Sequence, residues 1–167
     1  MMILMDAVSY FTFMRDIPFR LPVSVDEPAP YCVDKHVVLK TLLSSIGFKT
    51  RYAICRWMWS SLDMPESLKQ IPHEDHAVHV YLEVYNNEQS RWMTVDATWD
   101  KGLASKLPVS EWDGKSDTSL AIKPLDRMNP IESQEEFDQL KPRIQQAIKV
   151  NGKFFEALNK WMESIRT

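Results

Sequence analysis

The chain has 167 residues, of which 44% are hydrophobic, and a formal net charge of -3 at pH 7. A chain of this length and composition is expected to form one domain around a single core. The slightly acidic balance argues against a nucleic-acid-binding surface, which usually shows a basic bias. No apolar stretch approaches the roughly 18 residues that indicate a membrane-spanning helix, so we expect no membrane partner.

The cysteine content and the first residues bear on localisation. Two cysteines, Cys32 and Cys55, are too few for a disulfide framework, which favours a reduced intracellular setting. The apolar start MMILM meets Asp6 at once and has no basic segment before it, unlike a secretory signal peptide. We therefore expect a cytoplasmic protein.

The first sixty residues predict two helices and a strand. Apolar residues at helical spacing predict an amphipathic helix over residues 2–15. After a loop punctuated by prolines, Cys32 precedes an apolar run that predicts a helix over 33–46, with Gly47 as its stop. That helix is apolar over much of its circumference, so we expect it to be buried at the centre of the domain. Residues 49–59 alternate and are rich in β-formers, which predicts a strand.

The middle of the chain predicts a β-hairpin. Residues 60–75 are polar and contain two prolines, which predicts a loop. Two β-rich runs follow, HVYLEVY and SRWMTVDATW, and the polar stretch 86–89 joins them as a short turn. Residues 101–129 predict irregular structure with one short strand over 120–123.

The end of the chain predicts two helices. Ser133 and Glu136 form a Ser-x-x-Glu capping box that predicts a helix start, and we expect Pro142 to end or kink that helix. A last helix is predicted from about Gly152, with its large apolar side chains on one side. The order of helices, strands and helices predicts an α+β domain with an antiparallel sheet.

Cys32 is the candidate nucleophile. At the start of a helix, free N–H groups and the positive end of the helix dipole stabilise a thiolate. Cys55 lies in the middle of a predicted strand, and we interpret it as a small buried hydrophobe.

A nucleophilic cysteine needs a base, and the base needs an orienting acceptor. His79 and Asp96 lie on the two strands of the predicted hairpin. We expect them directly opposite each other, with Cβ atoms about 5 Å apart, which centres the turn between Asn87 and Glu88. Strand alternation points His76 to the other face, so we interpret His76 as structural.

Two alternatives stay open from the residues alone. His36, one turn beyond Cys32, is a second candidate base, although its direction on the helix competes with core positions. The histidines His73, His76 and His79 suggest zinc, but their spacing fits neither the paired-cysteine pattern nor His-Glu-x-x-His. We expect no metal and no other cofactor.

An ordered set of motifs resembles the transglutaminase-like superfamily. In that family a cysteine at a helix start is followed by Gly-x-x-x-Arg, which Gly47 and Arg51 match. The pattern His-x-x-x-Glu-Val then opens a strand, here at His79, and Trp-x-x-x-Asp closes the next, here with Trp92 and Asp96.

The resemblance covers roughly residues 11–100. We take this stretch as the core of one domain over 1–167, with a helical C-terminal part at about 131–167. The implied fold is a cysteine-protease-like α+β fold, in which a central helix with the cysteine at its N-terminus packs on an antiparallel sheet.

The resemblance also implies a papain-like triad. Cys32 would attack the carbonyl of an amide, His79 would take and return the proton, and Asp96 would orient the imidazole. The backbone N–H of Cys32 would bind the oxyanion. The family usually has a glycine just before the cysteine, where this chain has Pro30-Tyr31. We expect Tyr31 and Trp99 to contact the substrate.

The implied reaction is acyl transfer or hydrolysis through a thioester acyl-enzyme. Its substrate would be an amide in a protein, a peptide or a small molecule. The alternative is a non-catalytic module that keeps this fold to bind a peptide or a protein. The oligomeric state stays open.

Overall fold

A four-stranded sheet with the strand order β3-β2-β1-β4 organises the structure, a computed structural model that describes residues 6–167. All neighbouring strands are antiparallel, so the predicted α+β class with an antiparallel sheet is confirmed. The strands are β1 (Thr50–Met58), β2 (His76–Asn86), β3 (Arg91–Val95) and β4 (Asp126–Arg127).

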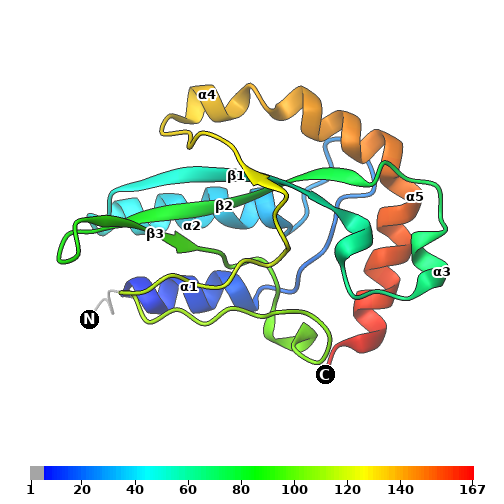
Figure 1. Ribbon diagram of the computed structural model, residues 1–167, viewed down its shortest axis with the longest axis horizontal. Coiled ribbons are helices and arrows are strands. Elements are labelled where there is room, and N and C mark those ends of the chain that lie inside the picture. Colours follow the sequence, from blue (N-terminus) through cyan, green and yellow to red (C-terminus); the bar gives the residue numbers. More distant parts are fainter. Residues whose placement is uncertain (1–5) are drawn as a thin grey trace.

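Five α-helices surround the sheet among the described residues. They are α1 (Ala7–Asp16), α2 (Cys32–Ser45), α3 (Glu66–Lys69), α4 (Gln134–Asp138) and α5 (Lys141–Ile165), with short 3-10 turns at Trp59–Ser61 and Lys101–Leu103. In Figure 1, α5 begins above the sheet beside α4, bends, and then runs down past the ends of the strands. Within residues 6–167, none of the helices combines the length and apolarity that a membrane crossing requires.

The two N-terminal helices largely follow their predicted bounds. Asp6 caps α1 by accepting a hydrogen bond from the Ser9 amide at 2.8 Å; residues 2–5 of the predicted helix lie outside the described residues. Helix α2 ends before Gly47, whose φ of 94° lies in the left-handed region that favours glycine. The prediction that α2 is buried at the centre of the domain holds for one face of the helix only. Its inner face includes Lys35, while Val38 is 46% exposed.

The hairpin exists, but its predicted register is wrong. Leu82 pairs with Val95 and Asn86 with Arg91, which centres the turn one residue later than expected. Asn86 belongs to β2 rather than to the turn, because it pairs with Arg91. Its side-chain oxygen accepts the Gln89 amide at 3.0 Å across the turn. Extending this register would put Asp96 opposite Tyr81, two residues from His79.

The C-terminal predictions need three corrections. No strand forms at 120–123; instead Asp126–Arg127 pairs with β1. Ser133 does cap α4, accepting from the Glu136 amide at 3.1 Å. Pro142, however, stands in the first turn of α5 and so begins this helix, where its missing N–H costs nothing. The helix predicted from Gly152 is the second part of α5.

Alternate residues of β1 divide between two cores. Tyr52 and Ile54 join a cluster with the buried residues of α1 and α2. Ala53, Cys55 and Trp57 join a second cluster with the buried residues of α5. The sheet therefore separates an α1/α2 core from an α5 core, and side chains at its ends can contact both layers.

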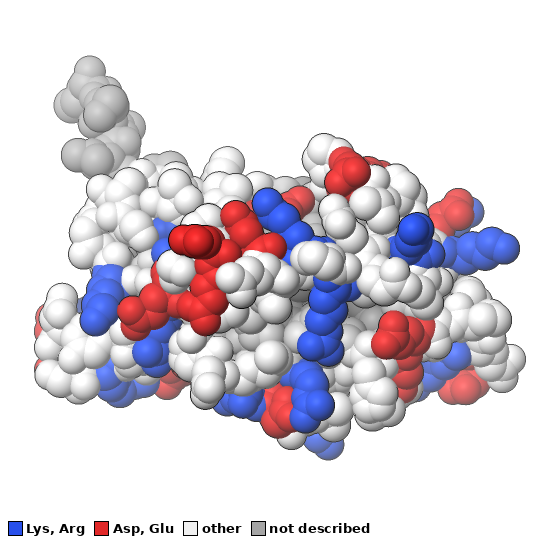
Figure 2. Space-filling model, turned by 90° about the horizontal axis from the view of Figure 1, so that it is seen from above, with Lys and Arg blue, Asp and Glu red and all other residues white. Residues whose placement is uncertain are grey.

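The charged surface is mixed. On the face seen from above in Figure 2, acidic and basic side chains are interspersed. This distribution agrees with the small net charge of -3 and gives no broad field of one sign on this face.

Candidate active site

Cys32 occupies the first position of α2, and its N-cap, Tyr31, makes no side-chain cap bond. The first amides of a helix have no partner within the helix. The thiol is partly exposed and lines a cavity of about 240 Å³. The predicted position of Cys32 at a helix start is therefore confirmed.

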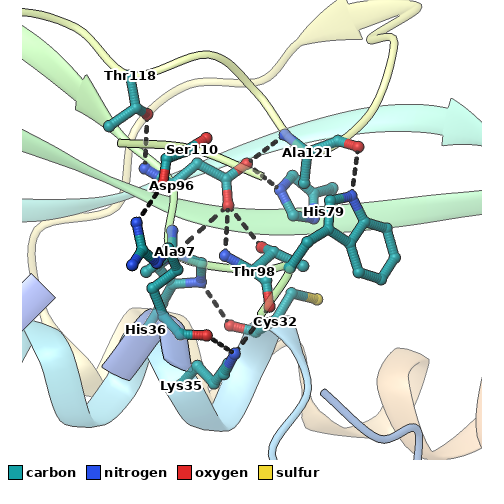
Figure 3. Close-up of polar contacts among 12 residues, drawn as sticks. Cys32, Lys35, His36, His79, Asp96, Ala97, Thr98, Ser110, Thr118 and Ala121 are labelled. Carbon is teal, nitrogen blue, oxygen red and sulfur yellow. Dashed lines mark hydrogen bonds and ion pairs between the residues drawn. The ribbon is translucent and has the colours of Figure 1, made fainter. Parts of the chain in front are cut away.

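His79 and Asp96 meet despite the corrected register. The Nε2 of His79 lies 2.8 Å from Oδ2 of Asp96, and both side chains are buried. Asp96 directly follows the end of β3, and diagonal neighbours across a strand pair remain within reach of long side chains. Figure 3 shows the two side chains pointing toward each other above the start of α2.

Four groups besides His79 fix the Asp96 residue. Oδ1 accepts from the amide of Thr98 at 3.1 Å and from its hydroxyl at 2.5 Å. Oδ2 also accepts from the amide of Ala121 at 2.8 Å, and the Asp96 amide donates to the hydroxyl of Thr118 at 2.9 Å. With these donors, the carboxylate can remain ionised although it is fully buried.

The contact between His79 and Asp96 shifts the pKa of each side chain in the direction that favours its charged form. Burial opposes the imidazolium, but the Asp96 carboxylate and contact with Cys32 outweigh it and raise the pKa of His79 to about 10. Burial likewise opposes the carboxylate, but His79 and Thr98 hold the pKa of Asp96 below its ordinary value. Because Nε2 faces Asp96, Nδ1 of His79 is the nitrogen available to a proton from Cys32.

His36 is fully buried beside the pair, and its hydrogen bonds define its tautomer. Nδ1 lies 2.7 Å from the carbonyl oxygen of Cys32, which can only accept. Nε2 accepts from the Ala97 amide at 2.9 Å. The ring is therefore neutral with its proton on Nδ1, and burial lowers the pKa of His36 to about 4. Both nitrogens are occupied, so His36 is poorly placed to act as the base.

Lys35 also supports this region through hydrogen bonds. Its ammonium donates to the carbonyl of Arg15 at 2.9 Å and to that of Thr98 at 2.8 Å. Burial lowers the pKa of Lys35 to about 7, against the pull of nearby Asp100 and Asp96. Lys35 thus connects α2 to the end of α1 and to the segment that follows β3.

The other residues singled out in the sequence differ in their exposure and in their relation to the cavity. Tyr31 and Trp99 both line the cavity that contains Cys32. The indole N–H of Trp99 donates to the Ala121 carbonyl at 2.7 Å and is not free to bind an oxyanion. Cys55 is buried, and burial raises the pKa of its thiol to about 12. His76 is exposed at the start of β2.

Sequence reasoning missed the residues that support the site. It assigned no role to Lys35, Thr98 or Ala121, and it considered His36 only as a competing base. A signal was present for the helix residues, because positions three and four after Cys32 lie on the same helix face. No local pattern indicates the Ala121 amide, which arrives from a loop 25 residues beyond Asp96.

Comparisons with known proteins add no family assignment. No protein-family model, no curated protein and no solved structure matches the chain. Among residues 6–167, no group of three or more His, Cys, Asp or Glu side chains is placed to hold a metal ion.

Proposed function

We propose that the protein is a transglutaminase-like thiol enzyme with a cysteine-protease-like fold, which cleaves or transfers the acyl group of an amide. The observation that carries this proposal is the buried His79–Asp96 pair at 2.8 Å. A partly exposed cysteine at the start of a helix, Cys32, helps to raise the pKa of this histidine. Cys32 is the nucleophile, His79 the base and acid, and Asp96 the orienting group.

In the proposed reaction, the thiol proton has moved to Nδ1 of His79 before the substrate reacts, which the raised pKa of His79 favours, and Sγ of Cys32 then attacks the carbonyl carbon. The oxyanion of the tetrahedral intermediate accepts from the backbone N–H of Cys32. The C–N bond then breaks, and the imidazolium of His79 gives its proton to the leaving amine. The thioester that remains is attacked by water, which gives hydrolysis, or by a second amine, which gives transfer.

The test is a screen of small amides, peptides and glutamine donors with the wild type and with Cys32→Ala. We expect turnover of at least one class by the wild type and none by Cys32→Ala, with the same circular dichroism spectrum for both proteins. Cys55→Ala is the matched control and should keep the activity. Iodoacetamide should label Cys32 faster than Cys55 near neutral pH; equally slow labelling of both would argue against an activated thiol.

The same screen tests the base and the alternative function. His79→Gln should lose turnover; full activity in this variant, together with loss in His36→Gln, would transfer the role of base to His36. A ligand that binds the wild type tightly without being turned over would favour the non-catalytic binding module.

A further inference from the structure

The cavity that contains Cys32 extends from the start of α2 to the far wall formed by α5. Val33 lines it beside the thiol, Trp57 and Val80 line it from the sheet, and Ile144, Ala147 and Ile148 line it from α5. The floor and walls near the thiol are therefore apolar. This composition is typical of a pocket that removes an apolar group from water.

The charged residues of the lining lie at the opening. Glu74, His76 and Arg143 line the cavity but are exposed to solvent. Asn151, which is buried in the wall, uses its amide on the backbone of Glu74, accepting from the N–H at 2.8 Å and donating to the carbonyl at 3.3 Å. The interior thus offers no charged group to a ligand.

The volume sets the size of the occupant. A cavity of about 240 Å³ is smaller than the roughly 300–1,000 Å³ typical of drug-sized ligands. It is suited to one compact group rather than to a folded partner or a long chain. Because Cys32 belongs to the lining, this group would be part of the molecule that the thiol attacks.

We propose that this cavity is the acyl subsite of the enzyme and that it takes a compact apolar acyl group, of the size of an aromatic side chain. The inference rests on the proposed function and specifies its substrate class. The acyl donor is then an amide of an apolar carboxylic acid, whose hydrocarbon part lies between α5 and the sheet. The leaving amine lies toward the charged opening.

Chloromethyl ketones test the subsite without knowledge of the natural substrate. The thiolate of Cys32 forms an S–C bond with the chloromethyl carbon of these reagents as chloride leaves. The group on the other side of the ketone then occupies the position of the acyl group. We compare chloroacetone, which carries a methyl group, with 1-chloro-4-phenylbutan-2-one, which carries a phenylethyl group. The second-order rate constant for alkylation of Cys32 is measured by mass spectrometry and divided by that of glutathione with the same reagent.

We expect the phenylethyl reagent to react about tenfold or more faster than chloroacetone on this corrected scale, as burial of an aromatic ring would give. Ala147→Trp, which fills the cavity from α5, should remove this advantage, so that the corrected rates of the two reagents become equal. Val150→Trp is the control, because Val150 is exposed on the same helix and does not line the cavity.

Two outcomes would overturn the acyl subsite: equal corrected rates for the two reagents on the wild type, or a phenylethyl advantage that survives in Ala147→Trp. Failure of the proposed function looks different. In that case chloroacetone would alkylate Cys32 no faster than it alkylates glutathione, and His79→Gln would not change that rate.

Discussion

Two histidines whose ring centroids lie 6.4 Å apart have pKa values that are shifted in opposite directions. His79 donates to the Asp96 carboxylate, and this contact raises the pKa of His79 to about 10. His36 donates to one backbone group and accepts from another, and burial lowers the pKa of His36 to about 4. The role of each histidine therefore depends on its partners and not on its burial, since both are buried.

The raised pKa of His79 predicts how pH changes the cost of removing it. The folded state keeps a proton on His79 that the unfolded state loses above about 6.5, so its contribution to stability is full below pH 6.5 and is lost as pH rises toward 10. Lys35 acts in the opposite sense, because its pKa is lowered to about 7: the penalty for burying its charge is full below pH 7 and is lost as pH rises to about 10.4. In the wild type, the opposite pH dependences that His79 and Lys35 contribute to the free energy of unfolding offset each other.

His79→Gln removes the pH dependence that His79 contributes to the free energy of unfolding. The free energy of unfolding of this variant should rise between pH 7 and pH 9.5 relative to the wild type, by up to about 1.4 kcal/mol per pH unit. Urea denaturation of both proteins at pH 7, 8.25 and 9.5 measures the difference. A difference that stays constant over this range would show that His79 is not protonated in the folded protein.

His36→Leu should destabilise the protein because two backbone groups each lose a hydrogen-bond partner. The Cys32 carbonyl loses a donor and the buried Ala97 amide loses its acceptor, and each costs about 1–3 kcal/mol. We expect a total loss of about 2–4 kcal/mol in urea denaturation, and a smaller loss for His36→Gln, whose amide can replace one bond. Equal losses for Leu and Gln would mean that packing, and not hydrogen bonding, is the role of His36.

Helix α5 packs so closely against the loop that contains Val23 that one residue of the helix has no room for a side chain. A Cβ added to Gly152 would lie 2.8 Å from the carbonyl oxygen of Val23. Asn159, two turns further along, holds the same loop by accepting from the Leu21 amide and donating to its carbonyl, both at 2.9 Å. This docking fixes the wall of the cavity beside Cys32.

Gly152→Ala should therefore destabilise the protein, although alanine is the better helix former by about 1 kcal/mol. The neighbouring atom is backbone, so the helix or the loop must shift, at a cost of about 1–3 kcal/mol. Thermal unfolding measures the effect, with the exposed Lys149→Ala on the same helix as a control that should stay within about 0.5 kcal/mol of the wild type. A more stable Gly152→Ala would show that the close approach to Val23 is absent in solution.

The sequence predicts those elements whose signals are local. Helix α2 and the hairpin were found because periodicity, Gly47 and the polar turn all lie within a few residues of what they define. The start of α5 was missed because Pro142 is compatible with either the end or the first turn of a helix. β4 has two residues and forms only through pairing with β1, so nothing in its own sequence indicates a strand.

The candidate site shows the same difference between features with local signals and features that depend on distant parts of the chain. Cys32, His79 and Asp96 could be selected from spacing and motif order, and the structure brings His79 and Asp96 together. The register that brings them together could not be derived, because Asn86 continues β2 by one residue and moves the turn. One of the donors that keep Asp96 charged, the Ala121 amide, comes from a loop 25 residues further on, which only the folded chain brings to the carboxylate.

Asp100 joins three segments that lie far apart in the chain. Its Oδ2 accepts from the amide of Phe19 at 2.7 Å and from the guanidinium of Arg166 at 2.9 Å. Arg166 also donates to the carbonyl of Phe19 at 2.8 Å. Since Phe19 packs edge-on against Trp99 at 4.6 Å and both line the cavity, this cluster connects the C-terminal end of the chain to the wall beside Cys32.

A double-mutant cycle on Asp100 and Arg166 should therefore show coupling. Burial opposes the Asp100 carboxylate, but Arg166 and the Phe19 amide outweigh it and lower the pKa of Asp100. In the wild-type background, Arg166→Met leaves the buried carboxylate of Asp100 with fewer donors. In the Asp100→Asn background, the same substitution removes a donor from a side chain that carries no charge. We expect the first substitution to cost about 1–2 kcal/mol more than the second, measured by urea denaturation at pH 7. Costs that agree within about 0.5 kcal/mol would mean that the ion pair between Asp100 and Arg166 contributes no coupling to the stability.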